Sequence, residues 1–119
     1  MPDTALFYDT KHASATENYY STLLHELTHW TGGKKRLDRK NDPNKKHIEN
    51  YAFEELIAEL GAAFLCAQHH INQTQSRDHA LYIKSWLSAL RNNKTLIFKA
   101  SAQAAKATTY LNALQQEYA

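Results

Sequence analysis

The chain has 119 residues, of which 43% are hydrophobic and 22% charged, and its formal net charge is +2. This length suits one domain with one core, and the composition excludes wholesale disorder, collagen-like chains and disulfide scaffolds. Three glycines and two prolines are too few for a β-sandwich, and no apolar run approaches the roughly 20 residues that span a bilayer. We expect a single domain over residues 1–119 with no membrane partner; the sequence does not determine its oligomeric state.

The first predicted elements are a short strand and a helix. Leu6–Tyr8 predicts at most one edge strand, and the alternative is an extended arm. A helix is expected from Ser14, because Glu17 follows at capping-box spacing. Its apolar positions recur at helical intervals: Tyr20, Leu23, Leu24, Leu27 and Trp30. We expect Gly32–Gly33 to end this helix, with a glycine in the left-handed conformation.

The segment 33–48 is strongly basic and contains the breakers Pro43 and Asn44. It holds seven of the fourteen Lys and Arg residues: Lys34, Lys35, Arg36, Arg39, Lys40, Lys45 and Lys46. We predict an exposed basic loop, in which Lys34, Lys35 and Arg36 are candidates for contacts with nucleic-acid phosphates. A solvated surface is the alternative, and no aromatic residue interleaves with these cations as in single-strand binders.

Three further helices are predicted downstream. The second covers Glu49–His69, and Gly61–Ala63 makes its middle thin enough for another helix to approach closely. The third runs from near Ser76 to Asn92–Asn93, and the fourth begins near Thr95 and is rich in alanine. The predicted fold class is mainly α (α+β if the strand forms), with about four helices.

The lone cysteine, Cys66, lies in the second predicted helix and cannot form a disulfide within the chain. We expect it to be a small core residue. A reduced compartment is consistent with one cysteine and with an N-terminus that shows no signal peptide, so we expect a cytoplasmic protein.

The chemistry lies in the motif His25-Glu26-Leu27-Thr28-His29. Residues four apart on a helix differ by about 40° in direction, so both imidazoles can bind one metal ion. The carboxylate of Glu26 is placed to act on a water at that metal. This HExxH pattern predicts two zinc ligands, His25 and His29, and a general base, Glu26.

A third protein ligand is needed if one coordination position is to remain open for water. The candidates are Glu54, Glu55 and Glu59 on the second helix. We assign Glu55 to the metal and Glu59 to the other ring nitrogen of a ligating histidine. Glu54 remains an alternative third ligand, because sequence does not fix the rotation of the helix.

Nearly the whole sequence resembles a known family. The matching stretches are residues 19–32 around the motif, Arg36-Leu37-Asp38-Arg39, the run 51–65 with its Glu54-Glu55 pair, the run 79–87 and the alanine-rich last helix. Together they look like the zincin-like metallopeptidase domain of ArdC-type antirestriction proteins, which recurs in polyvalent proteins of mobile elements. In that family a domain that binds single-stranded DNA precedes the peptidase domain, and strands precede the motif helix. Only 24 residues precede His25 here, with at most one short strand, so we expect a truncated zincin.

The resemblance implies a gluzincin-type hydrolase of a peptide or protein substrate. Zn²⁺ would lower the pKa of its water to about 7, and Glu26 would take the proton and pass it to the leaving amine. Such sites often add a donor for the oxyanion, and His79 and Tyr82 are candidates. A capping histidine and a core tyrosine are the alternative interpretation of these two residues.

A competing hypothesis is a non-catalytic binding module. Such a module would contact DNA or a restriction enzyme, and its metal would be structural. It predicts that charge reversal of the loop cations abolishes function while Glu26→Gln does not. A helical bundle with an accidental HExxH motif would bind no zinc.

Overall fold

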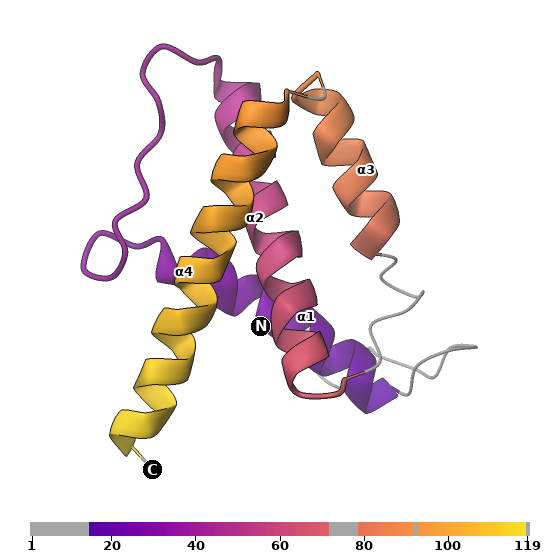
Figure 1. The fold of residues 1–119 in the computed structure, drawn as a ribbon, viewed down its shortest axis with the longest axis vertical. Helices are drawn as coiled ribbons and strands as arrows, with labels where there is room; N and C mark the ends of the chain where they lie inside the picture. The colour runs from indigo at the N-terminus through magenta and orange to yellow at the C-terminus, as the bar shows by residue number, and fades with distance from the viewer. Residues whose placement is uncertain (1–14, 72–78, 92, 119) are drawn as a thin grey trace.

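The computed structural model describes residues 15–71, 79–91 and 93–118 (Figure 1). These residues form four helices: α1 (Ala15–Thr31), α2 (His47–Gln68), α3 (His79–Ala89) and α4 (Lys94–Tyr118). The described residues contain no strand, whereas the predicted strand at Leu6–Tyr8 and the predicted capping residue Ser14 lie outside them. The mainly helical fold class is confirmed, and the helices follow one another as predicted.

Helix α2 lies at the centre and packs against each of the other three helices. In Figure 1, α4 runs along the front of α2, α3 lies to one side, and α1 passes across behind α2 and α4. Helix α1 also contacts α4. The two helices that carry the motif and the candidate carboxylates, α1 and α2, are therefore direct neighbours.

The apolar core lies between α2, α4 and the end of α3. Its buried members are Ala52, Leu56, Ile57, Leu90, Ala100 and Ala104. Alanines dominate the buried face of α4, which allows its backbone to lie close to α2. Within the described ranges, no helix combines the length and apolar character that crossing a bilayer requires.

The buried face of α1 is polar, which differs from the apolar face that the sequence predicted. Tyr20 and Trp30 are 45% and 43% exposed. The residues of α1 with less than a tenth of their surface exposed are Ser21, His25, Thr28 and Thr31. These residues recur at helical spacing, so they form one stripe along the helix. The stripe is made of short side chains plus one motif histidine, and the larger leucines are only partly buried beside it.

Gly61 marks the closest approach of α2 to Thr28 of α1. A Cβ atom at Gly61 would lie 2.5 Å from Cγ2 and 2.8 Å from Oγ1 of Thr28. Thr28 is fully buried, and its hydroxyl donates a hydrogen bond to the Leu24 carbonyl at 2.8 Å. The predicted close approach at the thin middle of the second helix is therefore confirmed, and a glycine is required at this point.

Helix α1 ends at Thr31, immediately before the predicted glycine pair, but the predicted mechanism is wrong. No described glycine has a positive φ. Instead, a Cβ atom at Gly32 would lie 2.7 Å from the guanidinium of Arg39, and one at Gly33 would overlap Arg36. Two arginine side chains therefore fold back over the end of the helix into the space that the glycines leave, and only Arg39 is held there by burial.

Cys66 is fully buried on α2, as expected for a small core residue. Burial raises the pKa of its thiol, and a hydrogen bond with Ser21 opposes part of that rise. The thiol is therefore poorly suited to nucleophilic or metal-binding chemistry, which needs the thiolate.

Candidate metal centre

The two motif histidines face one another across one turn of α1. Their ring centroids lie 4.8 Å apart, and the two Nε2 atoms are 3.2 Å apart. His25 is buried with 6% exposure, whereas His29 is partly exposed. The i, i+4 spacing has therefore brought two imidazole nitrogens to a common point at the α1–α2 interface.

The carboxylate of Glu55 completes this point from α2. Its Oε1 lies 3.0 Å from Nε2 of His29, and its Oε2 lies 3.3 Å from Nε2 of His25. One ligand atom from each of the three residues lies within 4.8 Å of the others. Three donors at 2.0–2.1 Å from a tetrahedral ion would be about 3.3 Å apart, so this N₂O set fits a divalent cation.

The second nitrogen of each ring faces a different carboxylate of α2. Oε1 of Glu59 lies 3.0 Å from Nδ1 of His25, and Glu59 is almost fully buried. Nδ1 of His29 donates a hydrogen bond to Oε2 of Glu54 at 2.8 Å. Glu54, the alternative third ligand, therefore lies on the far side of the His29 ring from Glu55. The three carboxylates have three separate positions around the imidazole pair.

These contacts hold His29 and Glu54 in a strongly coupled electrostatic pair. Burial alone lowers the pKa of His29, but the hydrogen bond to Glu54 and the charges of Glu55, Glu54 and Glu26 outweigh it and raise the pKa. Burial alone raises the pKa of Glu54, but hydrogen bonds from His29 and Arg39 outweigh it and lower the pKa. Glu54 is therefore held as a carboxylate that accepts from both neighbours.

Arg39 was not predicted as part of this site. Its side chain is only 7% exposed, so the prediction of an exposed basic loop is wrong at this residue. Nε and Nη2 each donate to a different oxygen of Glu54 at 2.9 Å. The resemblance included Arg39 as a matching residue, but nothing in local spacing distinguishes it from the other cations of the loop.

The remaining motif residue, Glu26, is exposed, as a base that meets solvent and substrate must be. Its negative charge is the smallest of the contributions that raise the pKa of His29. Tyr82 is 41% exposed on α3, and its assignment as an oxyanion donor stays a prediction. His79 begins α3, but its side chain lies outside the described residues.

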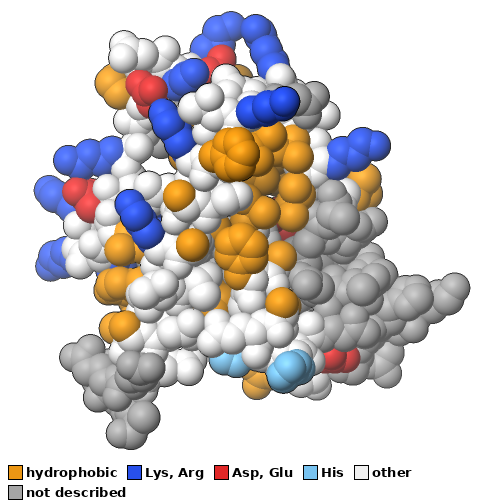
Figure 2. Space-filling view, in the orientation of Figure 1, with side chains coloured by type: hydrophobic (Ala, Val, Ile, Leu, Met, Phe, Trp, Pro, Cys, Tyr) orange, Lys and Arg blue, Asp and Glu red, His pale blue; other side chains and the backbone are white. Residues whose placement is uncertain are grey.

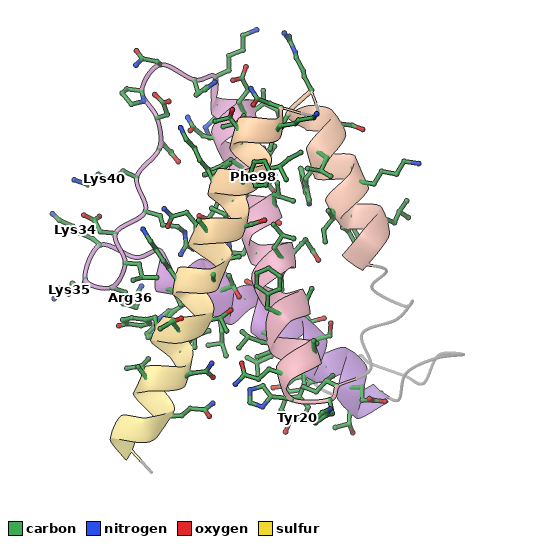
Figure 3. All side chains as sticks on the ribbon, viewed as in Figure 1. Tyr20, Lys34, Lys35, Arg36, Lys40 and Phe98 are labelled. Carbon is green, nitrogen blue, oxygen red and sulfur yellow. The ribbon has the colours of Figure 1, made fainter. Side chains whose placement is uncertain are left out.

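Most of the loop between α1 and α2 is exposed, as predicted. Lys34, Lys35 and Lys40 point away from the helices (Figure 3), and blue side chains gather along this edge in Figure 2. Arg36 differs, because its guanidinium lies 4.2 Å from the ring centroid of Trp30 and its Nε donates to the Trp30 carbonyl. Of these four loop cations, the three lysines are exposed to solvent and Arg36 is partly covered.

Comparison with known proteins shows which family this chain resembles. The model of the zincin-like metallopeptidase family matches residues 1–103. The y4eC protein of Sinorhizobium fredii is 38% identical over 117 residues, and DNA primase TraC of Escherichia coli is 40% identical over 117 residues. Both alignments cover 98% of this chain, but only 36% and 10% of the respective relative. The chain thus spans about a third or less of the curated relatives it matches.

Two solved structures are also similar. The metal-free crystal structure of antirestriction protein ArdC from plasmid R388 is 48% identical, with a TM-score of 0.63. The Mn(II)-bound structure of the same protein is 46% identical, with a TM-score of 0.57. Each alignment covers 83% of this chain, and 35% and 34% of the ArdC chain respectively. Because the family model spans most of the sequence and includes the helices of the candidate centre, this chain belongs to the zincin-like metallopeptidase family.

Proposed function

We propose that this chain is a zinc-dependent metallopeptidase domain in which His25, His29 and Glu55 hold the metal and Glu26 is the general base. The observation that carries the proposal is the convergence of two Nε2 atoms and one carboxylate within 4.8 Å. The contacts on the opposite ring nitrogens support it. A carboxylate at each Nδ1 favours the tautomer with Nδ1–H, which leaves the Nε2 lone pairs available as ligands.

The chemistry divides between the cation and the chain. A bound divalent cation would supply Lewis acidity, which polarises a substrate carbonyl and makes water a usable nucleophile near neutral pH. Glu26 supplies the base: its exposed carboxylate accepts a proton from the attacking water and transfers it to the amine that leaves. Glu54 orients His29 through a hydrogen bond, and the buried carboxylate of Glu59 lies 3.0 Å from Nδ1 of His25 without hydrogen-bond geometry.

The choice of zinc rests on the donor set. Two imidazoles and one carboxylate form a common catalytic zinc site with an open fourth position. The ArdC relative was crystallised with Mn(II), and a nitrogen–oxygen set of this kind accepts both ions. Zinc and manganese must therefore be compared directly on the same protein.

The test is metal content together with peptide hydrolysis. We expect about one zinc per chain, hydrolysis of casein or a fluorogenic peptide library, loss of hydrolysis after chelation and its return on adding zinc. His29→Ala should lose the metal, whereas His69→Ala, which changes an exposed histidine at the end of α2, should keep it. Tight zinc binding without hydrolysis of any substrate would contradict the catalytic part of the proposal.

A second candidate function is a non-catalytic module that contacts DNA. It is favoured by the exposed lysines of the loop and by relatives that are named antirestriction protein and DNA primase. Phosphate contacts of this kind are independent of sequence and weaken with salt.

For this candidate, Lys34→Glu combined with Lys35→Glu is expected to weaken binding of a single-stranded oligonucleotide at least tenfold and to reduce its salt dependence. Fluorescence anisotropy at several salt concentrations measures both. Lys84→Glu combined with Lys94→Glu, an equal change of charge at exposed positions of α3 and α4, serves as the control. Equal binding by the loop and control variants would exclude the loop as a DNA-binding surface.

A further inference from the structure

Arg39 connects the loop between α1 and α2 to the candidate metal centre. Its guanidinium donates to both oxygens of Glu54, and Glu54 accepts in turn from Nδ1 of His29. Arg39 makes two further contacts: Nη1 donates to Oγ1 of Thr31 at 2.8 Å, and Nη2 donates to the carbonyl of Thr28 at 2.8 Å. Each of the three guanidinium nitrogens therefore has at least one acceptor.

Backbone hydrogen bonds also hold the turn that carries Arg39 against the end of α1. The amide of Leu37 donates to the carbonyl of Thr31 at 2.8 Å, and the amide of Arg39 donates to the carbonyl of Gly32 at 3.0 Å. The missing side chain of Gly32 leaves the space that the guanidinium fills. A residue in such a tight turn and a nearly closed pocket has little rotamer freedom left to lose.

We propose that Arg39 is a positioning residue for the metal centre, acting through Glu54 on His29. This inference rests on the proposed metal site, and it adds a loop residue that does not touch the metal. Glu54 is one-third exposed, so without Arg39 its carboxylate would be free to rotate into solvent. His29 would then lose the acceptor that orients its ring, and the free ring would bind the cation less tightly.

The proposal requires arginine rather than any cation. Two parallel N–H···O bonds fix both the position and the plane of a carboxylate, whereas a lysine ammonium supplies a point charge. Arg39→Lys should therefore retain the charge beside Glu54 without retaining its orientation. This variant also separates orientation from simple charge balance.

If Arg39 only stabilised the fold, its removal would give a different experimental result. Arg39 also binds acceptors at the end of α1, so its removal could destabilise the fold without affecting the metal. A double-mutant cycle distinguishes the roles, because two residues that act through one another are not additive. The cycle consists of Arg39→Met, Glu54→Gln and the double variant, each measured for zinc affinity and for unfolding of the metal-free protein.

Competition with a chromophoric chelator should show that Arg39→Met weakens zinc binding about tenfold. A loss of affinity of this size is typical when a hydrogen-bond partner of a ligating histidine is removed. Arg39→Lys should give an intermediate loss, and the double variant should bind no more weakly than Glu54→Gln alone. Lys40→Met, which removes the neighbouring but exposed cation, should bind zinc as the unchanged protein does.

Two outcomes would overturn the proposal, and they differ in scope. Zinc binding that is equally tight with and without Arg39, or effects of Arg39→Met and Glu54→Gln that add fully, would overturn this inference alone. An unchanged protein that binds no zinc at His29 would overturn the proposed function as well. If Arg39→Met fails to fold, Arg39→Lys and Glu54→Gln form the cycle, and the same non-additivity decides the question.

Discussion

Replacing Glu26 with glutamine is expected to lower kcat/KM for peptide hydrolysis by about 10²–10⁴-fold and to leave zinc stoichiometry at one per chain. Glutamine has nearly the shape of glutamate but cannot accept a proton, so the base is lost while the site keeps its form. Glu26 lies outside the cluster of His25, His29 and Glu55, so the metal should remain. Initial rates on one peptide and metal analysis of the same preparation measure both quantities.

The matched control is Glu49→Gln, the same chemical change in the first turn of α2. It should leave both hydrolysis and zinc content unchanged. Hydrolysis that survives in Glu26→Gln would show that another group accepts the proton. Loss of zinc in this variant would instead show that Glu26 supports metal binding, and the assignment of Glu26 as the base would need revision.

Gly61→Val is expected to reduce the free energy of unfolding by about 3 kcal/mol. The first added carbon already falls 2.5 Å from Cγ2 of Thr28, and Thr28 is a short, fully buried residue with no room to withdraw. The helices α1 and α2 must therefore separate. Chemical denaturation of the metal-free protein measures the loss, and zinc affinity should fall with it, because these helices share the ligands between them.

Two further variants identify the cause of this destabilisation. Ala67→Val places the same side chain at an exposed position of α2 and should cost less than about 1 kcal/mol, the effect of helix propensity alone. In Gly61→Ala, adding Thr28→Ala removes Cγ2 and Oγ1, and the nearest remaining side-chain atom of residue 28 would lie 3.2 Å from the new Cβ. The double variant should therefore be more stable than Gly61→Ala. Additive effects would show that the two residues do not clash.

Local sequence patterns predicted the helices well because their causes are local. The helix-favouring alanines of α4 and the helical spacing of apolar residues act within a few positions of themselves. The HExxH spacing likewise predicts two imidazoles on one face, since four residues make about one turn. The proximity of His25 and His29 could therefore be predicted from the sequence.

The parts that could not be predicted depend on how helices rotate against one another. Sequence placed Glu54, Glu55 and Glu59 on one helix, but only the packing of α2 on α1 determines which nitrogen each carboxylate faces. The buried stripe of α1 was missed for the same reason. Leucines suggested the inward face, but a close approach at Gly61 admits only short side chains such as Thr28.

Arg39 illustrates a second limit of sequence reasoning. A cluster of cations between two helices is usually solvated. Nothing in the sequence distinguishes Arg39 from the other six cations of this loop. Its burial follows from a tertiary contact with Glu54, fifteen residues away. Gly32 was the available clue, because a glycine before such an arginine leaves the necessary room, but its conformational freedom offered a simpler explanation.

The candidate centre is contiguous along the chain: among the described residues, the ion pairs of the two imidazoles and of Glu54 join positions 25 to 59, on two successive helices and the loop between them. A site of this kind is inherited as one piece. Genetic exchange that carries this short stretch into another gene would carry all three candidate ligands together with Glu54, Glu59 and Arg39. The matched region, which contains this stretch, makes up between 7% and 36% of the curated relatives.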